Sequence, residues 1–247
     1  MSSVLSLAPD PRRDGVVAAI DLGSNTFHMI VGRLEKGQLH IVDKVRERVR
    51  LGAGLDDKRR LTPAAQARAL ACLARFEERL RAMGSGRVRT VGTNTLRQAR
   101  NGQDFLREAE RVLGHPIEII AGREEARLIY LGMRQTLPKL EGRRLVMDIG
   151  GGSTEFIMGE AEEMLLADSL YMGCVSYSQR FFQDGKITAK RFARAEVAAA
   201  LELQSSARKY RRLGWREAVG CSGTIHAIRI IGLAIGVYTD SITHKML

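Results

Sequence analysis

Apolar residues recur along this chain in two patterns, short runs that are typical of strands and spaced stripes that are typical of helices. Near the N-terminus, the runs VVAAIDLG and FHMIVGRLEKG flank a short polar turn, and a third run, QLHIVDKVRERVRL, follows the turn EKGQ. The pattern predicts two or three strands over residues 16–50.

The clearest helix is predicted over residues 62–83, where apolar side chains recur at helical spacing. Thr62 suits its N-cap, Pro63 its first turn and Gly84 its exit. The other elements predicted in this half are a strand at 87–93, helical segments at 94–100 and 103–113, a strand at 116–121 and a helix at 123–137.

The second half repeats the pattern, with strands predicted at RLVMDIG, TEFIMGE and EMLLADSLYMG. Further elements are predicted as helices at about 175–182 and 188–212, a strand at 217–223 and a helix at 224–236. Strands that alternate with helices predict an α/β fold with a mixed sheet in each half.

Both halves begin with the same unit, a strand, an acid, a glycine turn and a second strand, at Asp21 and at Asp148. The repeat predicts a duplicated, two-lobed protein with a cleft between the lobes. We expect a flexible lead-in over 1–15, a first lobe over 16–138 and a second lobe over 139–247, with the boundary near PKLEG (138–142).

The composition indicates a folded chain with an anionic partner. Of its 247 residues, 45% are hydrophobic, and 39 Lys and Arg against 28 Asp and Glu give a formal net charge of +11. Such a balance favours nucleic acid, anionic lipid or a phosphate-rich substrate, although a basic helical surface without a partner would give the same count. Aromatic residues make up 5% and do not interleave with the basic clusters, which argues against stacking on a nucleic acid.

The cysteines and the apolar segments bear on the compartment. Cys72, Cys174 and Cys221 lie far apart with no CxxC pair, so neither a zinc site nor a thioredoxin-like motif is indicated. Lone cysteines beside apolar residues are typical of buried thiols in a reducing compartment. No signal peptide and no membrane span is evident, so we expect a cytoplasmic protein with no membrane partner.

The two glycine turns are suited to holding anions, because successive amide N–H groups and the neighbouring hydroxyls can bind phosphate oxygens. The acid before each turn, Asp21 or Asp148, would repel a bare phosphate, and it is explained if Mg²⁺ lies between carboxylate and phosphate. Hairpins that merely need glycine are the structural alternative. The turns match neither GxxxxGK[ST] nor GxGxxG, and GCSGTI (220–225) is a third turn, before a helix, that could hold an anion.

Six strings in order resemble the exopolyphosphatase and guanosine pentaphosphate phosphatase (Ppx/GppA) family: AAIDLGSNTFHMIV, VGTNTLRQARN, IIAGREEARLIYLG, LVMDIGGGSTEF, MGCVSYSQRFF and GCSGTIHAI. The resemblance covers residues 16–247, and GSNTFHMIV with TNTLRQARN is closer to the exopolyphosphatase branch. The family belongs to the actin, sugar-kinase and heat-shock-chaperone ATPase superfamily, which implies a two-lobed actin-like (ribonuclease H-like) fold.

The resemblance also implies roles for particular residues. Glu125, in EEAR, matches the catalytic glutamate, Glu155 an acid that helps to place metal or water, and Arg97 an arginine that reaches the substrate phosphates. The first phosphate loop falls on Asp21, Gly23, Ser24 and Asn25, and the second on Asp148, Gly150, Gly151, Gly152, Ser153 and Thr154. Mg²⁺ or another divalent cation is implied at Asp21 and Asp148. From the residues alone, Glu125 is by default a solvated acid, Arg97 a surface ion-pair partner and His28 a packed core histidine.

Three functions follow from these residues. The leading hypothesis is an exopolyphosphatase that removes terminal phosphate from inorganic polyphosphate by Mg²⁺-assisted attack of water, with a glutamate as the base. The first alternative is the 5′-phosphatase of guanosine pentaphosphate, and the second is a non-catalytic, actin-like nucleotide-binding protein. The chain ends at DSITHKML, where the family continues, so we expect it to be a truncated piece. The resemblance is compatible with a homodimer for the full-length protein.

Overall fold

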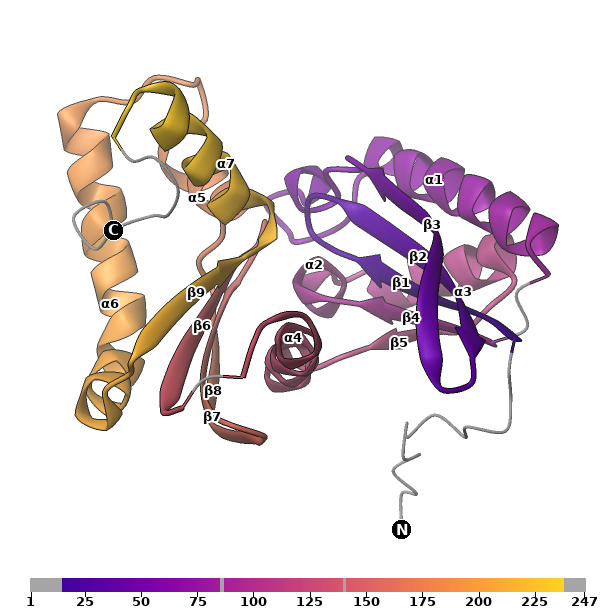
Figure 1. The fold of residues 1–247 in the computed structure, drawn as a ribbon. Coiled ribbons are helices and arrows are strands. Elements are labelled where there is room, and N and C mark those ends of the chain that lie inside the picture. The colour runs from indigo at the N-terminus through magenta and orange to yellow at the C-terminus, as the bar shows by residue number, and fades with distance from the viewer. Residues whose placement is uncertain (1–14, 85–86, 140, 238–247) are drawn as a thin grey trace, which may run out of the picture. The chain divides into compact units, whose positions relative to one another are not determined.

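The computed structural model describes residues 15–84, 87–139 and 141–237, and they form a mixed α/β fold, as predicted (Figure 1). The chain divides into two compact units, the first made of residues 1–92 and 98–119 and the second of residues 93–97 and 120–247. The expected lead-in falls almost wholly outside the described residues, as does the terminal DSITHKML.

The first unit is built on a sheet of five strands in the order β3-β2-β1-β4-β5. Its elements are β1 (Gly15–Leu22), β2 (Phe27–Glu35), β3 (Gln38–Glu47), α1 (Pro63–Ala82), β4 (Arg87–Gly92), α3 (Gly102–Leu113) and β5 (Ile117–Ile119). Strands β1, β2 and β3 are antiparallel neighbours, whereas β4 and β5 continue parallel to β1. Helices α1 and α3 cover one face of this sheet (Figure 1).

Local sequence signals account for α1 and for the covered sheet face. The Thr62 hydroxyl accepts a hydrogen bond from the Ala65 N–H at 3.4 Å, and Pro63 begins the helix, as predicted. Along β1, Ala18, Ile20 and Leu22 are buried beneath the helices, while Ala19 and Asp21 are exposed on the other face. That alternation is the period of a strand with one covered face.

The second unit is built on a sheet of four strands in the order β8-β7-β6-β9. Its elements are α2 (Asn94–Gln98), α4 (Gly122–Thr136), β6 (Arg143–Ile149), β7 (Thr154–Glu160), β8 (Glu163–Leu170), α5 (Cys174–Phe181), α6 (Ala189–Leu213), β9 (Glu217–Cys221) and α7 (Ser222–Ala234). On one face, Ala126, Tyr130 and Met133 of α4 pack on Val146 and Ile157. On the other face, α6 packs Tyr210 on the sheet (Figure 1).

The two sheets repeat each other at an offset of 127 residues (148 − 21). Asp21 pairs with His28 across the first hairpin, and Asp148 pairs with Glu155 across the second. Each sheet also has a β-bulge one strand further out, at Val31/Gly32 and at Met158/Gly159, again 127 residues apart (159 − 32). The predicted duplication is thus confirmed down to the irregularities of the sheets.

The structure divides the chain elsewhere than the boundary expected near 138–142. Helix α4, which we placed with the first lobe, packs on β7 and β8 and belongs to the second unit. Its apolar stripe was visible in the sequence, but a stripe does not say which sheet it covers. Among the described residues, no helix is long and apolar enough to cross a membrane.

Candidate active site

The second glycine loop, residues 150–153, is hydrogen-bonded to the first turn of α5. The N–H of Cys174 donates to the Gly150 carbonyl at 3.0 Å, and the N–H of Val175 donates to the Gly151 carbonyl at 2.9 Å. A Cβ on Gly173 would lie 2.5 Å from the backbone of Gly151, so only glycine permits this approach. The Gly150 N–H donates to the Ser153 carbonyl at 2.9 Å and closes the loop, so the amide N–H groups that could bind an anion are those of residues 151–153.

The first glycine loop, residues 23–26, is fastened in a comparable way within its own unit. The N–H of Gly52 donates to the Ser24 carbonyl at 2.7 Å, and the N–H of Arg50 donates to the Asn25 carbonyl at 2.8 Å. A Cβ on Gly23 would lie 2.8 Å from the Thr26 carbonyl oxygen, so this turn also requires glycine. Both predicted loops are therefore tight glycine turns whose carbonyls are bound by neighbouring backbone N–H groups.

Glu125 lies in the first turn of α4 and is held by Arg97 of α2. The Arg97 guanidinium donates to Glu125 Oε2 at 3.1 Å and to the carbonyl of Ile120 at 2.7 Å, so it fixes both the acid and the segment that leads into its helix. Burial raises the pKa of Glu125, the charge and hydrogen bond of Arg97 partly offset this, and the charge of Asp148 raises it further. Glu125 is therefore not the solvated acid that its helix position suggested.

Glu155 of β7 is the most deeply buried acid of the site, with 1% of its surface exposed. The Ser169 hydroxyl donates to Glu155 Oε1 at 2.7 Å, and Ser153 also hydrogen-bonds this carboxyl. Burial, with the charge of Glu125 as the second cause, raises the pKa of Glu155 to about 7. A Cβ on Gly122 would lie 2.5 Å from Ser169, so the start of α4 comes close to β8 only because residue 122 is glycine.

Asp148 is the last residue but one of β6 and lies directly opposite Glu155 in the register of β6 and β7. Burial raises its pKa, and a hydrogen bond from Ser222 partly counters the shift. Ser222 is the first residue of α7, and its hydroxyl also lies 2.8 Å from the Ile149 carbonyl. The third turn, GCSGTI, thus contributes to this site through a side chain.

The acids of the second unit have the chemistry of a hard-cation site. Asp148 and Glu155 supply carboxylate oxygens on one sheet face, and burial makes the charged form of each costly unless a cation is near. Mg²⁺ is bound in proteins by one or two carboxylates together with substrate phosphates and water. No cluster of three or more His, Cys, Asp or Glu side chains that could hold a metal ion occurs within residues 15–84, 87–139 and 141–237.

The predicted site residues thus fall into two groups. The second unit brings together Arg97, Glu125, Asp148, Glu155 and the second loop with Gly150, Gly151, Gly152, Ser153 and Thr154. The first unit holds Asp21 with Gly23, Ser24 and Asn25, and His28 is half-buried beside Asp21 rather than enclosed in the core. Ser169 and Ser222 were missed. Ser169 could not be predicted as the partner of Glu155, because the bulge at Met158/Gly159 changes the strand register from that of a regular hairpin.

Comparison with known proteins identifies the family. The model of the Ppx/GppA phosphatase family matches residues 30–246. The chain belongs to the Ppx/GppA phosphatase family. An Aeromonas hydrophila guanosine-5′-triphosphate,3′-diphosphate pyrophosphatase is 52% identical over 219 residues, which cover 89% of this chain and 44% of the relative. A Haemophilus influenzae protein provisionally named an exopolyphosphatase is 46% identical over 212 residues, 86% of this chain and 65% of the relative.

Solved structures of Ppx/GppA proteins have the same actin-like fold. An exopolyphosphatase from Cytophaga hutchinsonii is 27% identical, with a TM-score of 0.84 over 92% of this chain and 73% of that one. The Ppx/GppA enzyme of Aquifex aeolicus is also 27% identical, with a TM-score of 0.72 over 92% of this chain and 74% of that one. The fold class predicted from the sequence is confirmed, and the chain spans less than two thirds of the length of the curated relatives it matches.

Proposed function

We propose that this chain carries the catalytic residues of a phosphoanhydride hydrolase, which removes the terminal phosphoryl group from a chain of phosphates. The observation that carries the proposal is the pair formed by the partly buried Glu125 and the buried Glu155 beside the second glycine loop, with Arg97 bound to Glu125. Membership of a phosphatase family supports hydrolysis over mere binding of a nucleotide.

In the proposed reaction, Glu125 orients a water molecule and accepts its proton as the water oxygen attacks the terminal phosphorus. The bond from that phosphorus to the bridging oxygen breaks, and the shortened chain leaves. A carboxyl whose pKa is raised toward the working pH is a more effective base than an ordinary glutamate. The loop amides and Arg97 stabilise the charge on the transferring group, which is the main task in phosphoryl transfer.

A divalent cation such as Mg²⁺ would be held in the second unit by Asp148, with Glu155 beside it. Asp21 is the equivalent acid of the first unit and could hold a cation there. When bound, the cation neutralises phosphate charge. Ser169 and Ser153 hold the Glu155 carboxyl in place for that role.

Two substrates are candidates for this chemistry. Inorganic polyphosphate is favoured by the net charge of +11, since a long polyanion gains from many cationic contacts. Guanosine pentaphosphate is favoured by the 52% identity to a protein named for that activity, against 46% for the relative named an exopolyphosphatase. We keep polyphosphate first, because the net charge of +11 favours the longer anion.

The test is phosphate release from polyphosphate, guanosine pentaphosphate and ATP, each with Mg²⁺ and with EDTA. We expect release from a phosphate chain that depends on the metal, with polyphosphate having the higher kcat/KM. A higher kcat/KM for guanosine pentaphosphate would assign the second substrate. Turnover of ATP alone, or of none of the three, would contradict the proposed function.

A further inference from the structure

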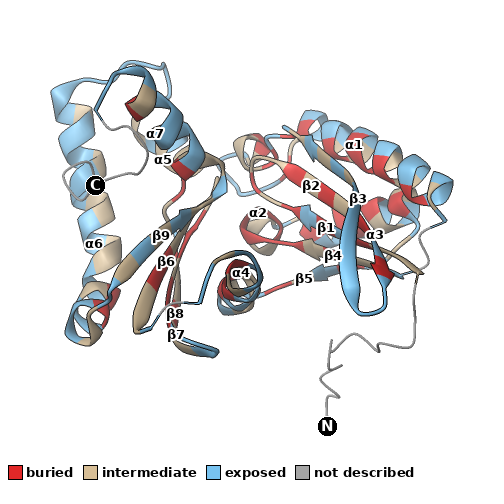
Figure 2. Ribbon diagram, viewed as in Figure 1, coloured by how far each residue is buried: buried red, intermediate tan, exposed pale blue. Residues whose placement is uncertain are grey.

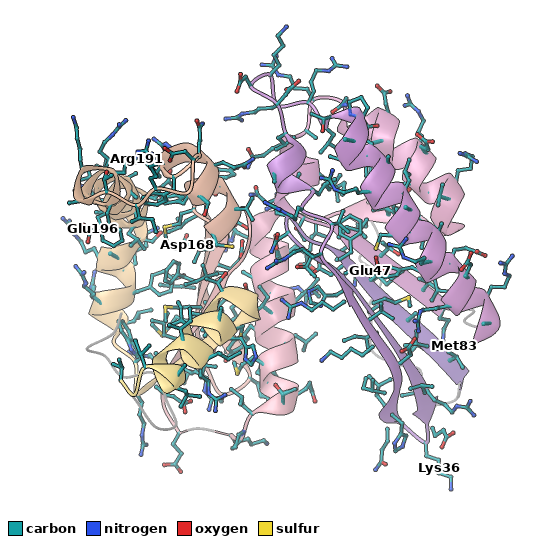
Figure 3. All side chains as sticks on the ribbon, turned by 90° about the horizontal axis from the view of Figure 1, so that it is seen from above. Lys36, Glu47, Met83, Asp168, Arg191 and Glu196 are labelled. Carbon is teal, nitrogen blue, oxygen red and sulfur yellow. The ribbon has the colours of Figure 1, made fainter. Side chains whose placement is uncertain are left out.

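Strand β3 carries acids on one face and bases on the other. Asp43 forms an ion pair with Arg79 of α1, and Glu47, labelled in Figure 3, forms one with Arg75 of the same helix. Lys44 and Arg46 alternate with these acids, so they lie on the opposite face, where β3 is exposed (Figure 2). The strand thus neutralises its acids within the unit and presents its bases outward.

The β-bulge between β2 and β3 produces this separation. Gly32 is opposite Ile41, but the next residue along, Val31, is opposite Asp43, so one residue of β3 is passed over. In an unbroken ladder the acids of β3, not its bases, would share a face with Asp21. Bulges commonly re-aim side chains next to functional sites.

The two outward bases lie on the same face as the acid of the first glycine loop. Asp21 is opposite His28, and His28 is opposite Arg46, so the three form one row across the sheet. Burial lowers the pKa of His28, and the charges of Arg46 and Lys44 lower it further, as expected for side chains on one face of the sheet. Further along, the Arg50 N–H is hydrogen-bonded to the loop, so the basic segment is joined to it.

These cations differ from their neighbours in lacking a protein counter-ion. Arg89, on the same sheet face, is paired with Glu118 at 3.0 Å. Lys44 and Arg46 make no ion pair within the part of the chain that the structure describes. Adjacent strands are about 5 Å apart, so the backbone of Arg46, two strands away, lies about 10 Å from the backbone of Asp21. An anion that reaches from the loop to this residue must be longer than a single phosphate.

We propose that Lys44 and Arg46, with His28 between them and the loop, form a subsite for additional phosphate groups of the substrate. The ligand class is a phosphoanhydride chain, supplied either by inorganic polyphosphate or by the phosphates of a guanosine pentaphosphate. The inference rests on the proposed function and extends it, since it assigns a place to the phosphates that do not react.

The test compares two double variants with the same loss of charge. Lys44→Gln with Arg46→Gln removes the subsite cations, and Lys209→Gln with Arg208→Gln removes one lysine and one arginine from the exposed surface of α6. Both pairs are placed in the Glu125→Gln background, so that binding is measured without turnover. Affinities for long polyphosphate, tripolyphosphate and guanosine pentaphosphate are measured by titration calorimetry over a series of salt concentrations.

We expect the β3 variant to bind long polyphosphate about tenfold or more weakly than its control, with a smaller loss for tripolyphosphate. Its salt dependence should fall by about one in log–log slope for each phosphate-contacting cation removed. A matching loss for guanosine pentaphosphate alone would assign the subsite to the nucleotide. Equal affinities of the two double variants for both ligands would overturn the subsite while leaving the proposed function intact. Failure of the parent to bind or, without the Glu125 change, to hydrolyse any phosphate chain would overturn both.

Discussion

The hairpins β1–β2 and β6–β7 put an acid and a glycine loop at the same register, yet the residue opposite the acid differs in kind. In the first unit it is His28, flanked by bases on an exposed face. In the second unit it is Glu155, buried beneath the start of α4. The two hairpins therefore share a backbone but differ in chemistry. The first has a basic face that suits phosphate binding, and the second has an acidic face that suits cation binding and proton transfer.

The largest effect should come from changing Glu125, the proposed base, which lies in the second unit. Glu125→Gln keeps the size and the hydrogen bonds of the side chain but cannot accept a proton, so kcat should fall about 10²–10⁴-fold. Phosphate release at saturating substrate measures the effect. Glu124→Gln is the matched control, because Glu124 is the preceding residue and pairs with Arg127 on the exposed side of α4. A Glu125 variant that kept more than about half the rate would remove this residue from the role of base.

The equivalent residues His28 and Glu155 should give opposite slopes of stability against pH. The pKa of Glu155 is raised to about 7 in the folded chain from an unfolded value of 4.5, so the folded state holds a proton that the unfolded state has lost between these values. Stability from this group is therefore complete below pH 4.5 and is lost as the pH rises through about 7. The shift corresponds to about 3 kcal/mol.

Urea unfolding in EDTA at pH 5 and pH 7.5 tests this difference. Glu155→Gln should flatten the loss of stability across that interval. Burial lowers the pKa of His28, so the contribution of this residue to the free energy of unfolding rises with pH below 6.5. His28→Gln should therefore remove a gain of stability with pH, whereas Glu155→Gln removes a loss. Parallel pH profiles for wild type and Glu155→Gln would show that Glu155 does not titrate in this range.

The bulge glycines give a smaller contrast. A Cβ on Gly159 would overlap the buried ring of Tyr130, which cannot move without displacing α4. A Cβ on Gly32 would instead approach the end of the Leu39 side chain, which is 56% exposed and can turn aside. Gly159→Ala should therefore lower the free energy of unfolding by about 1–3 kcal/mol, and Gly32→Ala by less. Denaturant melts of the two variants decide this, and equal losses would contradict the assigned packing.

Features made by residues that are close in sequence could be predicted, and features made by residues that are distant in sequence could not. Thr62 and Pro63 announce α1 because a cap involves only neighbouring residues. The two glycine loops were visible for the same reason. The pairing of Ser169 with Glu155 was not, because one bulged residue on β8 moves every later partner by one position. The apolar stripe of α4 also did not predict that this helix packs on the sheet of the second unit, because that packing depends on contacts between residues distant in sequence.

The hydrogen bonds from α5 to the second glycine loop affect the entropy of ligand binding at this loop. The carbonyls of Gly150 and Gly151 are bound by the helix whether or not a ligand is present, and the close approach of Gly173 fixes their position during folding. If this loop binds a phosphate, as we propose, its backbone is already ordered before the ligand binds, so little affinity is lost to ordering it. Binding at this loop should consequently be enthalpically favourable with a small entropic penalty, as in a rigid receptor, rather than coupled to local folding.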